Sequence, residues 1–81
     1  MYYVYVLKCA NSDLYVGYSD NLKKRFIAHT SEKVRSTKGK RPVELIYYEA
    51  YKTKHDATMR EYNLKTGQQR ELLKNRLKYS V

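Results

Sequence analysis

Residues 2–18, YYVYVLKCANSDLYVGY, decide the fold of this chain. Residues 2–9 are rich in aromatic and β-branched side chains, which predicts a strand, and residues 14–18 repeat that composition. Between them, residues 10–13 read Ala-Asn-Ser-Asp, which is typical of a turn. We therefore expect the two strands to form a β-hairpin.

The length of the hairpin loop decides which side chains share a face. A two-residue loop would pair Lys8 with Tyr15 and would place Tyr5 and Tyr15 on opposite faces. A three-residue loop at residues 10–12 pairs Leu7 with Tyr15 instead. Tyr5 then lies diagonal to Tyr15 on the same face, within reach of an aromatic neighbour. We expect the three-residue loop.

A helix is expected to follow over about residues 21–29. Asp20 is of the residue type that caps helix N-termini, and Leu22 and Phe26 are spaced to form a buried apolar stripe. Residues 30–41 have no apolar periodicity and are expected to form a loop.

The second half of the chain predicts a strand and two more helices. Residues 42–51 form the strand, and Thr53 with Asp56 three positions later begins a helix. This helix is expected to run to about Thr66, where Gly67 ends it.

A last helix is expected over about residues 68–78, with Leu73 and Leu77 as its apolar pair. The order is then β-β-α-β-α-α. It indicates an α/β fold of the α+β type, in which a small, mainly antiparallel three-stranded sheet is flanked by helices. At this length we expect one domain, residues 1–81.

The formal net charge of +9 comes from 17 Lys and Arg against 8 Asp and Glu. A charge of this sign favours polyanionic partners, and the absence of a long apolar run argues against a membrane. The single cysteine, Cys9, cannot form an internal disulfide, which fits the cytoplasm, and is expected to be a small buried side chain. The expected partner is therefore nucleic acid. The candidate nucleic-acid-binding residues are the cations Lys23, Lys24, Lys33, Arg35, Lys38, Lys40 and Arg41.

One carboxylate stands out in the helix after Thr53. Glu61 follows Ala57 by four positions, so it lies on or beside the apolar face of that helix. A carboxylate at such a position needs a partner, which would be an arginine such as Arg25 or Arg60, or a metal ion. The alternative is an exposed ion pair between Glu61 and Lys65, one helical turn further on.

Four other residues are candidates for a site only in combination. Tyr5 and Tyr15 are most simply cross-strand aromatic neighbours. Arg25 and His29, four apart on a basic helix, are compatible with a solvated surface. A guanidinium or a metal-bound water close to a tyrosine, however, would favour loss of the phenol proton.

Taken together, Tyr3-Val4-Tyr5, Tyr15-Val16-Gly17, Arg25, His29 and Glu61 resemble the GIY-YIG nuclease superfamily, and in particular its stand-alone, single-domain subgroup of small basic bacterial proteins. The resemblance covers residues 2–78. The first motif departs from the family, since Tyr3 and Val4 stand where the family has Gly and Ile.

The resemblance implies an endonuclease that hydrolyses phosphodiester bonds, with Mg²⁺ or Mn²⁺ as cofactor and DNA as the expected substrate. It implies that Tyr15 is the general base, that Tyr5 holds the phosphate or supports Tyr15, and that Arg25 stabilises phosphoryl charge. His29 would assist near the phosphate. Glu61 would be the metal ligand, a role that fits an ion which keeps most of its waters.

Gly17 would allow close backbone approach beside Tyr15. Two other functions remain open at this point. One is a non-catalytic DNA- or RNA-binding module that uses basic charge and exposed tyrosines. The other is an interaction domain whose tyrosine-rich strands form the surface of a homodimer.

Overall fold

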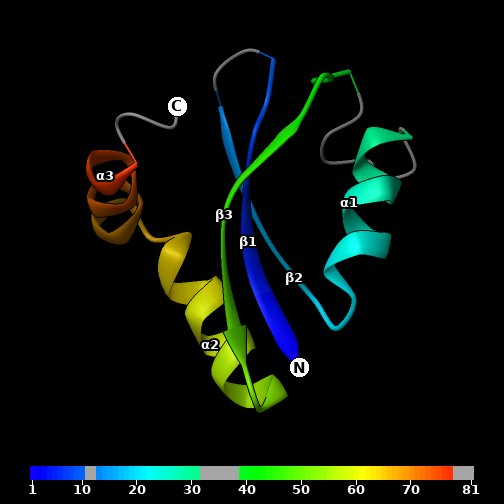
Figure 1. The fold of residues 1–81 in the computed structure, drawn as a ribbon. Helices are drawn as coiled ribbons and strands as arrows, with labels where there is room; N and C mark the ends of the chain where they lie inside the picture. Colours follow the sequence, from blue (N-terminus) through cyan, green and yellow to red (C-terminus); the bar gives the residue numbers. More distant parts are fainter. Residues whose placement is uncertain (11–12, 32–38, 78–81) are drawn as a thin grey trace.

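The computed structural model describes residues 1–10, 13–31 and 39–77. Its elements follow the expected order, and Figure 1 shows a sheet with helices on both sides. Their bounds are β1 Tyr2–Lys8, β2 Leu14–Ser19, α1 Leu22–Thr30, β3 Glu44–Tyr51, α2 Lys54–Leu64 and α3 Gly67–Arg76. The predicted fold class, a small antiparallel three-stranded sheet flanked by helices, is confirmed.

The first strand, β1, lies in the centre of the sheet, whose order is β2-β1-β3. Both pairings are antiparallel, and the register places Tyr5 opposite Gly17 on β2 and opposite Tyr48 on β3. An irregularity in the β1–β3 pairing falls between Val6 and Leu7. Tyr5 therefore occupies the middle of the sheet, with a neighbour on each side.

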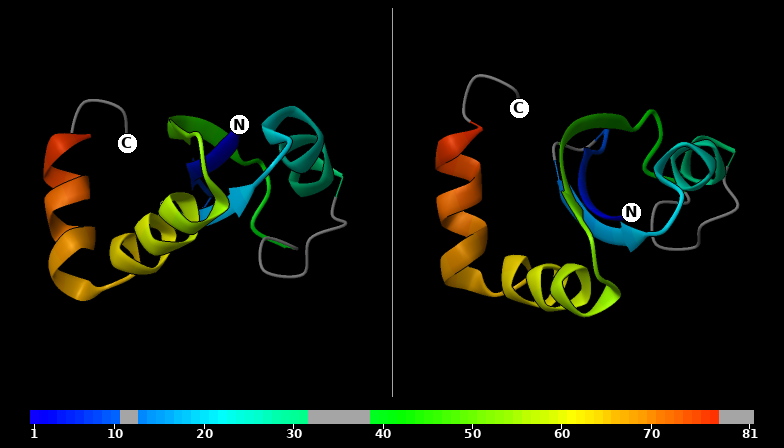
Figure 2. Two further views of the ribbon diagram at one scale, coloured as in Figure 1. Left: turned by 90° about the horizontal axis from the view of Figure 1, so that it is seen from below. Right: turned by 60° about the horizontal axis from the view of Figure 1, so that its bottom comes forward.

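The alternation of side chains along β1 separates two hydrophobic layers. Val4 and Val6 are fully buried in a cluster that includes residues of α2 and α3. Tyr5, Leu7 and Cys9 belong to a second cluster, against which residues of α1 pack. The views in Figures 1 and 2 agree that α1 lies on one side of the sheet and that α2 and α3 lie on the other.

Two of the smaller expectations are confirmed within this arrangement. Cys9 is buried, as predicted, and burial raises the pKa of its thiol. Leu73 and Leu77 are both buried in the α2 and α3 layer. Of the α1 stripe, Leu22 and Phe26 are half-buried against the Tyr5 cluster.

The predicted N-cap of α1 is wrong by one residue. Asn21, not Asp20, has the extended conformation of a cap, and its side-chain oxygen accepts a hydrogen bond of 3.1 Å from the backbone nitrogen of Lys24. The Ser19 hydroxyl is bonded to the backbone nitrogen and oxygen of Asn21. Asp20 is left exposed before the helix.

The predicted end of α2 is also wrong. The cap at Thr53 is confirmed, since its hydroxyl accepts from the nitrogen of Asp56 at 3.2 Å, but the helix ends at Leu64. Thr66 is extended, and its hydroxyl donates to the carbonyl of Asn63 at 2.8 Å, which satisfies a group in the last turn. Gly67 opens α3 rather than closing α2.

The third strand begins later than predicted. Residues 42 and 43 precede β3, whose first residue is Glu44. Pro42 lacks the N–H that a ladder position would use, which explains why the regular pairing starts beyond it.

Candidate active site

The hairpin places the two candidate tyrosines on one face of the sheet. Leu7 lies opposite Tyr15, and the nitrogen of Cys9 donates to the oxygen of Asp13 at 2.9 Å, so three residues separate the paired positions 9 and 13. The ring centroids of Tyr5 and Tyr15 are 6.4 Å apart. The expected three-residue loop is thus confirmed, and the alternative that separates the phenols is wrong.

The absence of a side chain at Gly17 leaves the space that the ring of Tyr5 occupies. A Cβ atom added to Gly17 would lie 2.4 Å from both Cζ and Oη of Tyr5, which is closer than atoms can approach. The expected close approach at Gly17 is therefore made by the phenol of the neighbouring strand. A side chain at this position would push the Tyr5 hydroxyl out of its present location.

His29 packs against both phenols. Its side chain is fully buried, and its Nε2 is 2.9 Å from Oη of Tyr5. Its ring also meets that of Tyr15 edge-on, with centroids 5.0 Å apart. Burial, together with the nearby charge of Arg25, lowers the pKa of His29 to about 4, so the imidazole is neutral at pH 7.

Arg25 completes the group from one turn earlier on α1. Its Nε donates to Oη of Tyr5 at 3.4 Å, and the hydrogen bond to Tyr5 raises the pKa of the guanidinium further above its usual value. Burial raises the pKa of Tyr5, although the hydrogen bond from Arg25 acts in the opposite direction. Because Tyr5 accepts from Arg25, its own hydrogen is available to Nε2 of His29, and we assign His29 the tautomer with hydrogen on Nδ1.

Glu61 belongs to the same electrostatic environment but comes from the other layer. Its carboxylate is close enough for its charge to contribute to raising the pKa of Tyr5, after burial and Tyr15. The side chain is 25% exposed and forms an ion pair of 3.2 Å with Lys65. Of the partners considered from the sequence, Arg60 binds Glu49 instead.

Glu61 could bind a magnesium ion only together with substrate phosphate and waters. Among residues 1–10, 13–31 and 39–77, no cluster of three His, Cys, Asp or Glu side chains could hold a metal by itself. A lone, partly exposed carboxylate is nevertheless the donor set that Mg²⁺ uses when substrate phosphate and waters supply its other ligands. Lys65 competes at the surface, where such pairs are weak.

The candidate cations fall into two groups. Lys23 and Lys24 are exposed on α1 beside Arg25. Lys40 and Arg41 lie near the other end of α1, since Nη1 of Arg41 donates to the oxygen of Thr30 at 2.8 Å. The expected cations at positions 33, 35 and 38 lie outside the described residues.

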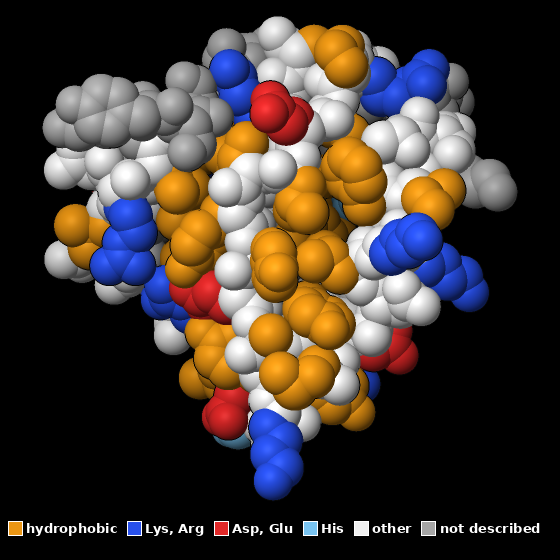
Figure 3. Space-filling model, viewed as in Figure 1, with side chains coloured by type: hydrophobic (Ala, Val, Ile, Leu, Met, Phe, Trp, Pro, Cys, Tyr) orange, Lys and Arg blue, Asp and Glu red, His pale blue; other side chains and the backbone are white. Residues whose placement is uncertain are grey.

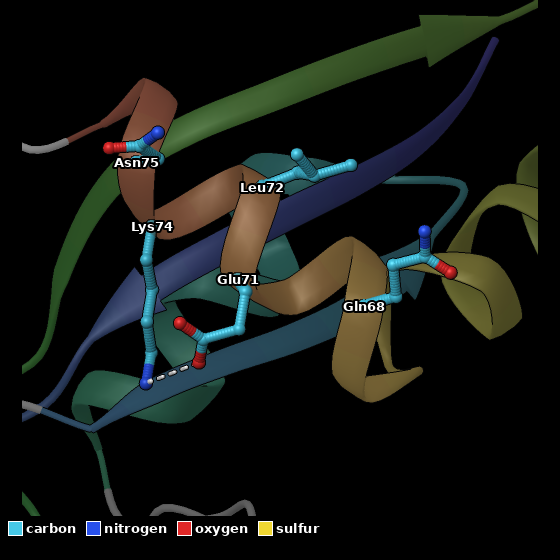
Figure 4. Close-up of a pocket in the computed structure, with 5 residues that line it drawn as sticks. All are labelled: Gln68, Glu71, Leu72, Lys74 and Asn75. Carbon is cyan, nitrogen blue, oxygen red and sulfur yellow. Dashed lines mark ion pairs between the residues drawn. The ribbon is translucent and has the colours of Figure 1, made fainter.

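Two hollows of the surface lie at the N-terminal half of α1, and another lies on α3. Arg25 lines a small hollow with Asn21, and a larger groove of about 600 Å³ lies between α1 and the sheet, with Tyr3 and Tyr48 among its lining residues. Figure 4 shows a third hollow, which side chains of α3 alone surround, including the ion-paired Glu71 and Lys74. The first two share α1 with the candidate active site, and this third hollow does not.

Sequence reasoning did not single out Tyr48 or Tyr3 as site residues. Tyr48 lies directly opposite Tyr5, and Tyr3 precedes Tyr5 by two positions, so both share its face of the sheet. The alternation of residues in the strands would have indicated this face, but the partner of Tyr5 on β3 depends on a register that the sequence leaves open.

This arrangement coincides with a match to a known family. The family profile for the GIY-YIG catalytic domain matches residues 1–77. The chain belongs to the GIY-YIG family. Membership implies nuclease-type activity on nucleic acid. All the candidate site residues described above lie within the matched part of this GIY-YIG domain.

Similar proteins share the name UPF0213. The chain is 48% identical to a UPF0213 protein of Bacillus pumilus over 66 residues, which are 80% of this chain and 67% of the relative. It is 40% identical to one of Staphylococcus saprophyticus over 74 residues, 90% of each chain. The solution NMR structure of a UPF0213 protein from Bacillus halodurans is 32% identical, with a TM-score of 0.58 over 90% of this chain and 82% of that one.

The comparisons agree with the observed topology of this GIY-YIG domain, a three-stranded antiparallel sheet with three helices among the described residues. None of these helices has the length and the apolar composition needed to cross a bilayer.

Proposed function

We propose that this protein is a metal-dependent endonuclease that hydrolyses phosphodiester bonds in DNA with low sequence specificity. The observation that carries the proposal is the convergence of Tyr5, Tyr15, Arg25 and His29 on one face of the sheet, with the charge of Glu61 acting on the same phenol. This combination suits a reaction in which negative charge develops on a phosphoryl group.

The two tyrosines have different roles in this proposal. Tyr15 is only partly buried, so its hydroxyl can reach and orient the attacking water. Once it has given up its own proton to solvent, the resulting phenolate accepts the proton of that water. Tyr5 is 1% exposed, and its hydroxyl is engaged by His29 and Arg25. Of the two functions that the resemblance implies for Tyr5, these contacts favour support of its neighbours over direct contact with phosphate.

Arg25 stabilises the charge that develops on the phosphoryl oxygens. Its guanidinium is fixed through Nε by Tyr5, which orients it before substrate binds. His29 stays neutral and holds the Tyr5 hydroxyl, so we assign it a positioning role. Both residues act through geometry that the buried phenol sets.

Glu61 is the residue that would hold Mg²⁺ or Mn²⁺. When bound, the ion would polarise the phosphoryl oxygens and neutralise part of their charge. Arg60 does not neutralise Glu61, because both of its bonding nitrogens contact Glu49. Among the described residues, the cation paired with this carboxylate is Lys65, which a metal ion would displace.

The test is nicking of supercoiled plasmid with Mg²⁺ or Mn²⁺. Glu61→Ala should reduce the rate at least about 100-fold, because a metal ion contributes several kcal/mol and each 1.36 kcal/mol is a factor of ten. DNA binding measured in EDTA should change by no more than about threefold, since one carboxylate is not a phosphate contact. Glu71→Ala is the matched control, because Glu71 is also a helix glutamate paired with a lysine.

Full activity of a pure Glu61→Ala protein would refute the assigned role. Binding without nicking in either ion would favour the second candidate, a non-catalytic DNA- or RNA-binding module. The ion pair between Glu61 and Lys65 is the observation that favours that candidate, because it already gives the carboxylate a partner.

A further inference from the structure

A groove beside the candidate active site is lined by rings that the proposed hydrolysis does not use. Tyr3, Leu45 and Tyr48 contribute from the sheet, and Leu22 and Phe26 contribute from α1. Figure 3 shows a band of hydrophobic side chains down this face of the molecule, with lysine and arginine side chains on the α1 side. The groove is mainly apolar, and its polar lining comes from Asp20, Asn21 and Lys23.

Of the three aromatic residues in this groove, Tyr48 is exposed, and Tyr3 and Phe26 are half-buried. Tyr48 is 55% exposed, although it lies on a strand whose neighbouring tyrosines at 47 and 51 are hydrogen-bonded to Glu49. Its ring meets that of Tyr3 edge-on, with centroids 6.3 Å apart and an interplanar angle of 62°. The pair therefore presents an aromatic corner rather than a closed stack.

The groove and the hollow that holds Arg25 lie on different flanks of α1 and meet at its N-terminal end. Asp20 and Asn21 line both. Tyr48 lies directly opposite Tyr5, and Tyr3 is about 7 Å from Tyr5 along β1, since each strand residue rises about 3.3 Å. A nucleic acid whose phosphate contacts Arg25 would therefore cross the N-terminal end of α1, beside Asp20 and Asn21, to place its adjoining nucleotide in the groove.

The chemistry of the groove matches a nucleobase. A base has two flat apolar faces, which stack on aromatic side chains, and a polar edge, which the Asp20 carboxylate and the Asn21 amide at the groove wall can meet. Lys23, which also lines the groove, supplies a positive charge for a neighbouring phosphate. A base inside a continuous duplex has its faces covered by its neighbours and could not enter.

We propose that this groove binds one unpaired nucleobase next to the phosphate that Arg25 contacts, so that the protein acts on single-stranded or branched nucleic acid in preference to continuous duplex. This proposal rests on the proposed function for the identity of the phosphate site. It adds the class of substrate, and Tyr48 as the residue that recognises it.

The test measures binding in EDTA, where no hydrolysis takes place. The ligands are a single-stranded thymidine oligonucleotide and a chain of equal length that carries tetrahydrofuran spacers instead of nucleosides. Tyr48→Ala should weaken binding to the oligonucleotide by about 5- to 150-fold, the loss expected for one stacked base, and should leave binding to the base-free chain unchanged. Tyr48→Phe, which keeps the ring, should bind both as the parent protein does.

Tyr62→Ala is the matched control, because Tyr62 is an exposed tyrosine on α2, 70% accessible and outside the groove. Circular dichroism checks the fold of each variant, and Tyr48→Leu replaces Tyr48→Ala if the latter does not fold. An equal loss on both ligands, no loss with either Tyr48→Ala or Tyr48→Leu, or an equal loss with Tyr62→Ala would overturn the proposal.

The two proposals fail in different ways. Base-dependent binding through Tyr48 without nicking in any metal would refute hydrolysis and leave the groove assigned. Metal-dependent nicking of duplex plasmid at a rate that exceeds that of a single-stranded circle, with Tyr48→Ala unaffected, would leave the nuclease and refute the groove.

Discussion

One buried phenol determines how the residues of the candidate active site are arranged. Gly17 leaves room for the Tyr5 ring, and His29 and Arg25 satisfy its hydroxyl at 2.9 Å and 3.4 Å. A buried hydroxyl without partners would cost about 1–3 kcal/mol. The need to satisfy Tyr5 explains why a neutral imidazole is buried here, where a protonated one would be unfavourable beside Arg25.

The buried imidazole makes the stability of the protein depend on pH. The pKa of His29 falls from 6.5 to about 4 on folding, so the unfolded chain binds the proton more tightly. Stability is therefore fully present above about pH 6.5 and decreases as the pH falls toward 4, by roughly 3 kcal/mol at most, since each unit is about 1.4 kcal/mol. Urea unfolding between pH 4 and pH 7.5 measures this change.

His29→Gln should lower stability at every pH and should flatten the decrease between pH 6.5 and pH 4. His55→Gln, a change at the exposed histidine of α2, should retain the slope of the parent protein. The carboxylates also titrate in this range, so the comparison is made between variants. A His29→Gln protein with the unchanged slope would contradict the assigned environment.

At the scale of the elements, the sequence predicted those features that strong periodic patterns determine. The alternation in β1 and the composition of the loop after it were enough to place Tyr5 and Tyr15 together. Ends of helices were less predictable. Asp20 and Asn21 are both good N-caps, and the choice between them depends on the bond that Ser19 makes to Asn21.

Burial of a polar side chain was the other feature that the sequence could not determine. His29 has the same helical spacing from Arg25 whether it faces solvent or the core, and only the packing of β1 and β2 against α1 decides. The position of Gly67 relative to the helices was likewise not predictable. The extended Thr66 already separates α2 from α3, so α2 needs no glycine at its C-terminal end.

The α2 helix, which carries Glu61, is attached to the sheet by a polar contact. Arg60 donates to Glu49 of β3 through Nε at 2.9 Å and through Nη2 at 3.1 Å, and the hydroxyls of Tyr47 and Tyr51 donate to the same carboxylate. Burial opposes ionisation of Glu49, but these donors outweigh it and hold its pKa below the usual value. The contact fixes the rotation of α2 one residue before the proposed metal ligand.

Replacing Glu49 by Gln should therefore lower the free energy of unfolding by about 1–2 kcal/mol, because a two-pronged, charge-assisted contact is lost at a site that is largely, but not fully, shielded from solvent. Urea unfolding at pH 7 measures the loss. Glu71→Gln, which removes an exposed pair of 3.8 Å with Lys74, should cost no more than about 0.5 kcal/mol. Equal effects of the two changes would show that the Glu49 contact does not hold α2.

At the scale of the molecule, the sheet separates two sides with different charge patterns. The α1 side carries Lys23, Lys24 and Arg25 beside the candidate active site, and the acidic Asp20 is at the end of this row. On the other side, the cations of α2 and α3 alternate with carboxylates, and several form ion pairs with them. For the proposed function we therefore expect nucleic acid to follow α1.

This difference predicts how binding to single-stranded DNA depends on salt. Each lysine that contacts a phosphate releases counterions, so the loss of one contact should reduce the slope of log affinity against log salt by about 0.7. Lys24→Gln, on α1, should show this reduction when affinity is measured in EDTA between about 50 and 200 mM salt. Lys74 on α3 is also an exposed lysine of a helix, but it lies on the opposite side of the sheet, so Lys74→Gln should keep the slope of the parent protein. Equal reductions in the two variants would mean that the bound DNA does not follow α1, and would place the binding surface elsewhere.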